Sequence, residues 1–137
     1  MISVSTARAL RTSGLAWEPS SGDRFVITDR GMDEEVFVLS EMVVEAQEHA
    51  TGRVLGFNGT TEWALDSVDA EQAVWLPREG QLRALLGTSF TGLERTDDGF
   101  VVRTRDADGD RASRSEDAEE AYALAVLAVR ARAARSA

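Results

Sequence analysis

The stretch that decides the fold runs from Gly52 to Gly87 and reads GRVLGFNGTTEWALDSVDAEQAVWLPREGQLRALLG. Two β-prone runs, 53–57 and 60–66, flank Asn58-Gly59. This dipeptide readily adopts the positive φ angles of a tight hairpin turn. The first half of the stretch therefore predicts a β-hairpin.

The second half of the stretch predicts one further strand and a short helix. The apolar run 73–76 is strand-like and ends at Pro77, which suits the first turn of a helix because proline has no N–H to satisfy there. Leucines then recur on one helical face, and Gly87 supplies a C-terminal stop. We therefore expect a helix over 77–87.

The flanking sequence predicts more strands and a long helix at the end of the chain. Ser115 is placed to cap that helix, whose first turn is acidic and whose segment 121–129 is apolar all round. We expect one α+β domain over 1–137: a mainly antiparallel sheet of about six strands, with helices 77–87 and 116–134 packed on it. The other expected strands are 25–28, 36–39, 42–48, 90–95, 99–105 and a weak one at 111–114.

Composition excludes several classes of chemistry. The 137 residues contain no cysteine and no lysine, so thiolate sites, disulfides, Schiff bases and the phosphate-binding lysine of a P-loop are all absent. The net charge of −9 argues against nucleic acid as a partner, because phosphate binding needs a concentrated basic face. The longest apolar run is too short to cross a membrane, and the N-terminal residues do not resemble a signal peptide. We therefore expect a cytoplasmic protein.

Two motifs bear on metal binding and catalysis, and both are incomplete. Asp106, Asp108 and Asp110 have the spacing of a calcium loop, but Arg111 occupies the position that requires glycine. His49 is the single histidine, and no Gly-x-Ser-x-Gly elbow accompanies it. We expect no catalytic residue, no metal ligand and no cofactor, and the aspartates are interpreted as a solvated acidic turn.

Six residues form the candidate ligand or partner surface. Glu62 and Asp66 would share one face of the hairpin at 53–66, where two acids suit acid–base work or a magnesium ion. Tryptophans offer stacking surfaces, although anchoring between sheet and helix is the alternative, and an arginine can recognise an anionic group. The set is Trp17, Glu62, Trp63, Asp66, Trp75 and Arg78.

Several segments resemble short actinobacterial proteins of unassigned role. The matching runs are 17–23, 35–40, 57–67, 75–86 and 117–124, which together extend over most of the chain. Some of these proteins carry a transferred "pilus assembly protein" label, which properly belongs to a P-loop ATPase family whose Gly-x-x-x-x-Gly-Lys motif is missing here. The chain is more distantly similar to small phage-type α/β sandwich domains. Neither resemblance implies catalytic residues.

The leading functional hypothesis is a small non-catalytic binding or adaptor domain that acts through protein–protein contacts. A homodimer through the apolar C-terminal helix or an exposed strand edge fits this hypothesis. The alternative is a small hydrolase or metal-dependent enzyme that uses the acids of the 53–66 hairpin. A phage-derived or immunity-type protein is a third hypothesis.

Overall fold

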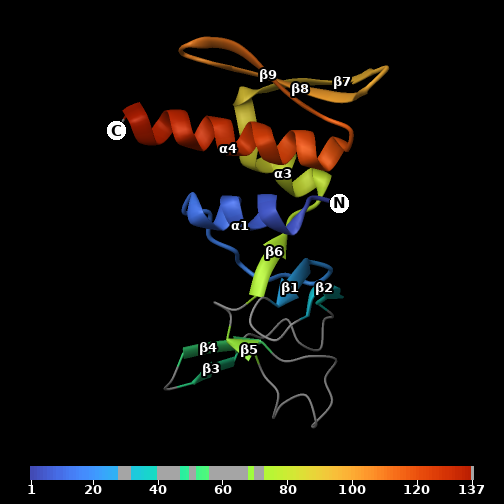
Figure 1. Cartoon of the computed structure of the whole chain (residues 1–137). Helices are drawn as coiled ribbons and strands as arrows, with labels where there is room; N and C mark the ends of the chain where they lie inside the picture. The colour runs from blue at the N-terminus through green and yellow to red at the C-terminus, as the bar shows by residue number, and fades with distance from the viewer. Residues whose placement is uncertain (28–31, 40–46, 50–51, 56–67, 70–72, 137) are drawn as a thin grey trace. The chain divides into compact units, whose positions relative to one another are not determined.

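The computed structural model describes the chain apart from residues 28–31, 40–46, 50–51, 56–67, 70–72 and 137 (Figure 1). The chain divides into two compact units. The first comprises Met1–Leu15 with Pro77–Ala137, and the second comprises Ala16–Leu76. The expectation of a single domain over 1–137 stays a prediction, and each unit is described by itself.

Three α-helices belong to the first unit: α1 (Val4–Thr12), α3 (Glu79–Leu86) and α4 (Ala118–Ser136). Helix α1 begins where the Ser3 hydroxyl accepts a hydrogen bond from the backbone N–H of Thr6, the usual capping geometry. Helix α3 ends at Gly87, whose φ of 58° is readily adopted only by glycine, and a short 3₁₀ turn, η2 (Gly87–Ser89), follows. The predicted helices 77–87 and 116–134 are therefore both present, with starts displaced by two residues.

The displaced starts have local causes. The carbonyl of Arg78 accepts the first helical hydrogen bond of α3, from Leu82, so Pro77 lies just outside the helix rather than in its first turn. At α4, the Asp117 carboxylate accepts a hydrogen bond from the N–H of Glu120 at 3.0 Å. Asp117 therefore caps α4, and the Ser115 hydroxyl instead accepts from the N–H of Asp117 at 3.3 Å.

A three-stranded antiparallel sheet completes the first unit, in the order β7 (Phe90–Thr96), β8 (Gly99–Asp106) and β9 (Gly109–Ser115). Consecutive strands are neighbours, as two successive hairpins require. The pairing shifts between Phe90 and Gly92, which makes Thr91 the extra residue of a β-bulge. Strand β8 lies in the middle and packs against α4, as Figure 1 shows.

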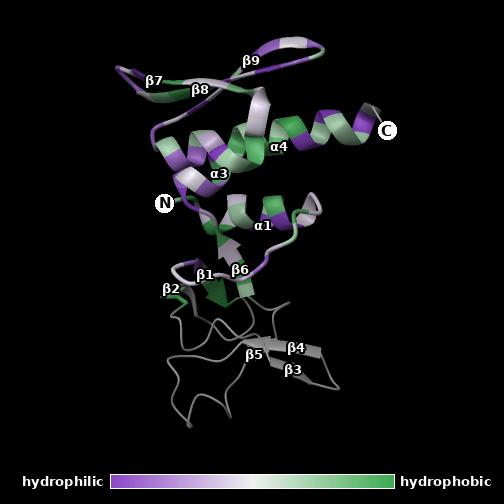
Figure 2. Cartoon of the chain, turned by 180° about the vertical axis from the view of Figure 1, so that it is seen from behind, coloured by the Kyte–Doolittle hydropathy of each residue, from purple (hydrophilic) through white to green (hydrophobic). Residues whose placement is uncertain are grey.

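The core of the first unit forms around the apolar part of α4. Ala121, Tyr122, Ala123, Ala125 and Val126 are all at most 3% exposed. Such burial on nearly every side follows because α4 packs against the sheet and against both α1 and α3. The sheet and the two helices therefore cover residues 121–123, 125 and 126, and the green turns of α4 in Figure 2 mark its apolar part.

The second unit contains two further three-stranded antiparallel sheets among its described residues. One has the order β2 (Met32–Val38), β1 (Arg24–Ile27), β6 (Ala73–Leu76). Its central strand is apolar, and Phe25, Val26 and Ile27 are at most 1% exposed. The other has the order β3 (Gln47–His49), β4 (Gly52–Leu55), β5 (Val68–Asp69).

The expected fold class is confirmed: the protein is α+β, with antiparallel strands, a short helix and a long C-terminal helix. Its described strands are divided among three small sheets. Strand β4 is the expected strand after Gly52, whereas the turn at Asn58-Gly59 and the run 60–66 lie outside the described residues. Strand β2 begins at Met32, within a segment that the sequence analysis did not assign to a strand. No helix in the described ranges is long and apolar enough to cross a membrane.

Candidate interaction surface

Two of the predicted tryptophans lie together in the second unit. The rings of Trp17 and Trp75 are within 8° of parallel, with centroids 6.5 Å apart. Trp17 also contacts Phe25, which in turn stacks on Phe37. Because Phe37 and Trp75 are both register partners of Phe25, their side chains share one face of the β2-β1-β6 sheet. The four rings form an aromatic row that Trp17 joins from outside the sheet.

A buried carboxylate fixes the position of Trp17. Asp23 is 1% exposed and accepts a hydrogen bond from the Trp17 indole N–H at 2.9 Å and another from the N–H of Ser20 at 3.0 Å. The indole nitrogen of Trp75 is also buried, and it has no hydrogen-bond partner within the described part of the chain. Trp17 is therefore held in place by contacts within the second unit, while the choice between ligand stacking and anchoring stays a prediction.

Of the other four predicted residues, the structure describes only Arg78. Arg78 belongs to the first unit, where its backbone N–H donates to the side chain of Gln81 at 2.9 Å as α3 begins. Glu62, Trp63 and Asp66 lie outside the described residues. The enzyme hypothesis that depends on Glu62 and Asp66 therefore stays a prediction.

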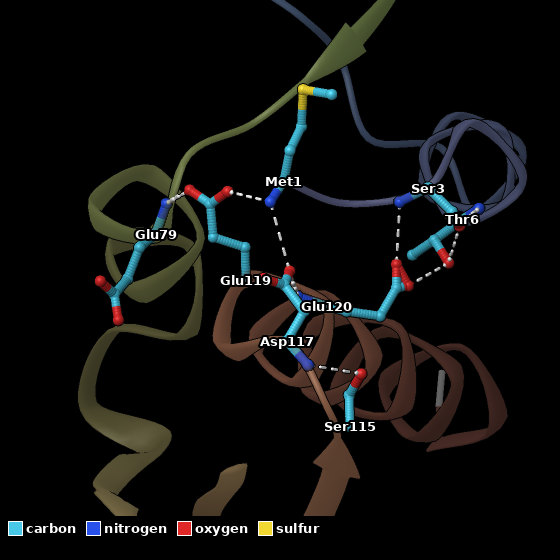
Figure 3. A network of polar contacts seen from close by, with 8 residues as sticks. All are labelled: Met1, Ser3, Thr6, Glu79, Ser115, Asp117, Glu119 and Glu120. Atoms are coloured by element: carbon cyan, nitrogen blue, oxygen red, sulfur yellow. Dashed lines mark hydrogen bonds and ion pairs between the residues drawn. The ribbon is translucent and has the colours of Figure 1, made fainter. Parts of the chain in front are cut away.

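The acids at the start of α4 hold the beginnings of neighbouring helices (Figure 3). Glu119 accepts a hydrogen bond from the N–H of Glu79 at 2.7 Å, and its other oxygen lies 3.0 Å from the Met1 ammonium. Glu120 accepts from the N–H of Ser3 at 3.0 Å and from the hydroxyl of Thr6 at 2.7 Å. Carboxylates favour these positions because the first N–H groups of a helix have no internal partner and carry partial positive charge.

This network also acts on the amino terminus. The hydrogen bond and charge of Glu119, aided by Asp117, raise the pKa of the Met1 ammonium above its ordinary value of 8.0. The acidic first turn that the sequence shows is therefore committed to contacts within the first unit.

The predicted acidic turn at 106–110 is likewise tied to arginines. Asp106 accepts from Nε of Arg132 at 2.6 Å and, through its other oxygen, from the N–H of Asp108 at 2.9 Å. Asp110 accepts from Nε of Arg105 at 2.6 Å. Each arginine holds the pKa of its carboxyl partner below the usual range. Within the described residues, no group of three histidines or acids is placed to bind a metal ion.

One face of the β7-β8-β9 sheet points away from α4. Val102, Thr104 and Asp106 alternate toward the helix, as the Asp106–Arg132 contact requires, so Arg103 and Arg105 project from the opposite face. Register adds further side chains to this outward face: Gly92 and Glu94 from β7, and Asp110, Ala112 and Arg114 from β9.

The outward face carries ion pairs that are open to solvent. Nε and Nη2 of Arg103 both donate to one oxygen of Glu94, at 3.1 and 3.0 Å. The side chains of this pair and of the Arg105–Asp110 pair are between 51% and 71% exposed. Together with Arg114, the face holds one more cation than anions, although the whole chain is acidic. In Figure 2, β9 is mostly purple and white, which marks hydrophilic residues.

Two shallow hollows lie on this sheet. The Arg103 hollow, of about 280 Å³, is lined by the two exposed β8 arginines and by residues of both neighbouring strands: Thr91, Arg103, Thr104, Arg105, Asp110, Arg111 and Ala112. The second, of about 300 Å³, lies toward the β7–β8 turn and includes Asp98, Arg114 and Glu116. The first hollow is thus mainly basic and the second mixed in charge.

No family model, curated protein or solved structure matches this chain. The geometry of the outward face is therefore the basis for the function proposed below. No single stretch of sequence marks this face, because the arginines are spread over two strands and only the register brings them together. The alternation of side chains along the predicted strand 99–105 places Arg103 and Arg105 on one face, and this was the sequence signal available for the site.

Proposed function

We propose that this protein is a small cytoplasmic, non-catalytic binding or adaptor domain that acts through protein–protein contacts. The observation that carries the proposal is the outward face of the β7-β8-β9 sheet, where Arg103, Arg105 and Arg114 project beside complementary carboxylates. Arginine is enriched at protein interfaces because its planar guanidinium makes several directed hydrogen bonds.

The contacts made by the acidic side chains at the start of α4 and at Asp106 support the same proposal. Asp117, Glu119 and Glu120 hold helix starts, and Asp106 joins a turn to α4. Each of these carboxylates is occupied by a contact that stabilises the fold. The outward arginines, by contrast, are in exposed pairs that cost little to rearrange, because surface ion pairs contribute about 0–1 kcal/mol.

Self-association through α4 is a narrower part of the proposal. Leu124 is 37% exposed in the middle of an otherwise buried apolar segment. Leu127, Ala128 and Ala131 follow it at helical spacing and are themselves partly or fully exposed. If a homodimer covers this stripe, light scattering should give the mass of a dimer. The Leu124→Glu variant should give the mass of a monomer. A monomer at every concentration tested contradicts this part alone.

Affinity capture tests the main proposal. The full chain, tagged at its C-terminus because the Met1 ammonium is engaged by Glu119, is used to capture partners from lysate of the native host. We expect a stoichiometric protein partner that also binds the pure domain in calorimetry. The variant Arg103→Glu/Arg105→Glu should lose this partner.

The matched control makes the same change of charge elsewhere. Arg11→Glu/Arg135→Glu alters two exposed arginines on α1 and α4 and should retain the partner. If no protein is captured, or if both double variants behave alike, this proposal is wrong. Turnover of a small molecule by the pure domain would favour the enzyme hypothesis instead.

A further inference from the structure

Gly92 is a glycine that the backbone does not require. It lies inside strand β7, and its φ is outside the positive region that glycine alone adopts readily. A Cβ built on it would meet no atom within 4 Å. Glycine inside a strand weakens the sheet, and one use of it there is to let a ligand or another chain approach closely. The bulge at the adjacent Thr91 is one local reason for a glycine here, and the open space above Gly92 also leaves room for a ligand or another chain.

The register places Gly92 beside the Arg103 hollow. Gly92 is the register partner of Arg103 on one side, and Ala112 is its partner on the other. Arg103 thus projects between two neighbours that have almost no side chain. The bulge at Thr91, which lines the hollow, bends the edge of the sheet at the same point. Ala112 and the bulged Thr91 line the hollow, and Gly92 is next to Thr91 along β7.

The arginines in this space keep hydrogen-bonding capacity. Arg103 uses Nε and Nη2 on Glu94, and Arg105 uses Nε and Nη2 on Asp110. A guanidinium has five N–H donors, so Nη1 of each is left without a hydrogen bond to the described residues. Arg111, exposed on β9, also lines the hollow as a third cation, from the register position beside Thr104 rather than beside Arg103 or Arg105.

The charges around the Arg103 hollow indicate which class of ligand it binds. Glu94 and Asp110 already neutralise two of the cations, so the hollow attracts one negative charge far better than two or more. A phosphate dianion or a run of nucleic-acid phosphates would meet both carboxylates at short range. A single carboxylate with two coplanar acceptor oxygens suits the free guanidinium donors.

We propose that the Arg103 hollow binds an aspartate or glutamate side chain from an acidic segment of a partner protein, and that Gly92 leaves the room for it. This inference rests on the proposed function and names the partner's chemistry. The partner carboxylate accepts hydrogen bonds from Arg103 and Arg105, while its backbone passes over Gly92 and Ala112. Charge complementarity between this face and an acidic segment orients the encounter.

The test selects peptides from a random display library on the full chain and measures the enriched peptides by calorimetry. We expect acidic peptides whose binding weakens at least about tenfold in Arg103→Gln, since a charge-assisted hydrogen bond is lost. Gly92→Val should weaken binding similarly while leaving the melting temperature unchanged or higher, because it adds a β-branched side chain beside Arg103 without a backbone penalty. Arg11→Gln should leave the affinity unchanged.

Several results would overturn the inference. These are enriched peptides without acidic residues, affinity that survives Gly92→Val, or equal binding of inorganic phosphate or duplex DNA. A second copy of the chain as the occupant would appear as a dimer that Gly92→Val dissociates, which also contradicts the inference. If Gly92→Val still captures the lysate partner, the inference is wrong and the adaptor function stands. If neither peptide nor lysate protein binds the wild type, both are wrong.

Discussion

Asp106 and Arg132 are 26 positions apart in sequence, yet the Oδ2 of the carboxylate lies 2.6 Å from Nε of the guanidinium. This contact joins the β8–β9 turn to the last third of α4. Arg132 is only 8% exposed, so its guanidinium depends on this carboxylate for a partner in place of water. The pair therefore ties the sheet to the helix on the face opposite Arg103 and Arg105.

Asp106→Asn is expected to lower the stability of the first unit at neutral pH. Arg132 holds the pKa of Asp106 below its usual 3.8, so the stabilisation is present above about pH 4 and is lost as pH falls through the lower, folded-state pKa. Urea unfolding of wild type and variant should differ at pH 7 and converge in strong acid. Asp108→Asn, in the same turn but exposed, is the control and should match wild type. A difference that is independent of pH would contradict the ion-pair explanation.

Gly99→Ala should be one of the most damaging single-atom additions in the first unit. The φ of Gly99 is 146°, and a Cβ there would collide with the carbonyl oxygen of Ser115 and approach the Cα of Glu116 to 2.7 Å. Gly109 also has positive φ, at 115°, but open space around it. We expect Gly109→Ala to cost about 1–2 kcal/mol from the backbone alone. Gly99→Ala should cost roughly 3 kcal/mol or more, measured by denaturant unfolding. Equal losses of stability in the two variants would show that the backbone shifts to relieve the collision at Gly99, and would contradict this prediction.

Glu120→Ala is expected to loosen α1 more than the rest of the first unit. The change removes the acceptor for the Ser3 N–H and for the Thr6 hydroxyl. Loss of such a cap costs about 1 kcal/mol. Amide hydrogen exchange should therefore speed up in α1 while β8 is unaffected. Glu116→Ala removes a nearby exposed acid outside the network of Figure 3 and serves as the control.

The Met1 ammonium should titrate above pH 8.0, and Glu119→Gln should bring its pKa back toward that value. Since the pKa is raised in the folded state, the contribution to stability is complete below pH 8 and is lost as pH rises through the folded-state pKa. The Met1 side chain is 43% exposed, so the contact is open to solvent, the effect on unfolding is small and NMR titration is the better measurement. An unshifted amine in the wild type would contradict the contact with Glu119.

Local sequence signals predicted helices α3 and α4 and most strands of the first unit. Their information lies in near neighbours: leucines at helical spacing before Gly87, and turn residues at Asp97-Asp98-Gly99. The start of α4 was misplaced because Ser115 and Asp117 are both good caps, and only the backbone geometry distinguishes them. The candidate site was harder to predict. Of its six residues, Trp17 and Trp75 do lie together, in a row of rings that also includes Phe25.

The sequence alone determined that this is an acidic α+β protein without cysteine or lysine, because composition and the periods of helix and strand are properties of adjacent residues. Only the tertiary structure decided that Gly92 and Ala112 flank Arg103, and that Asp106 meets Arg132. Strand register and the bulge at Thr91 depend on which distant segments pair and on how the sheet packs against α4. That choice minimises the free energy of the whole unit, so no short window of sequence contains it.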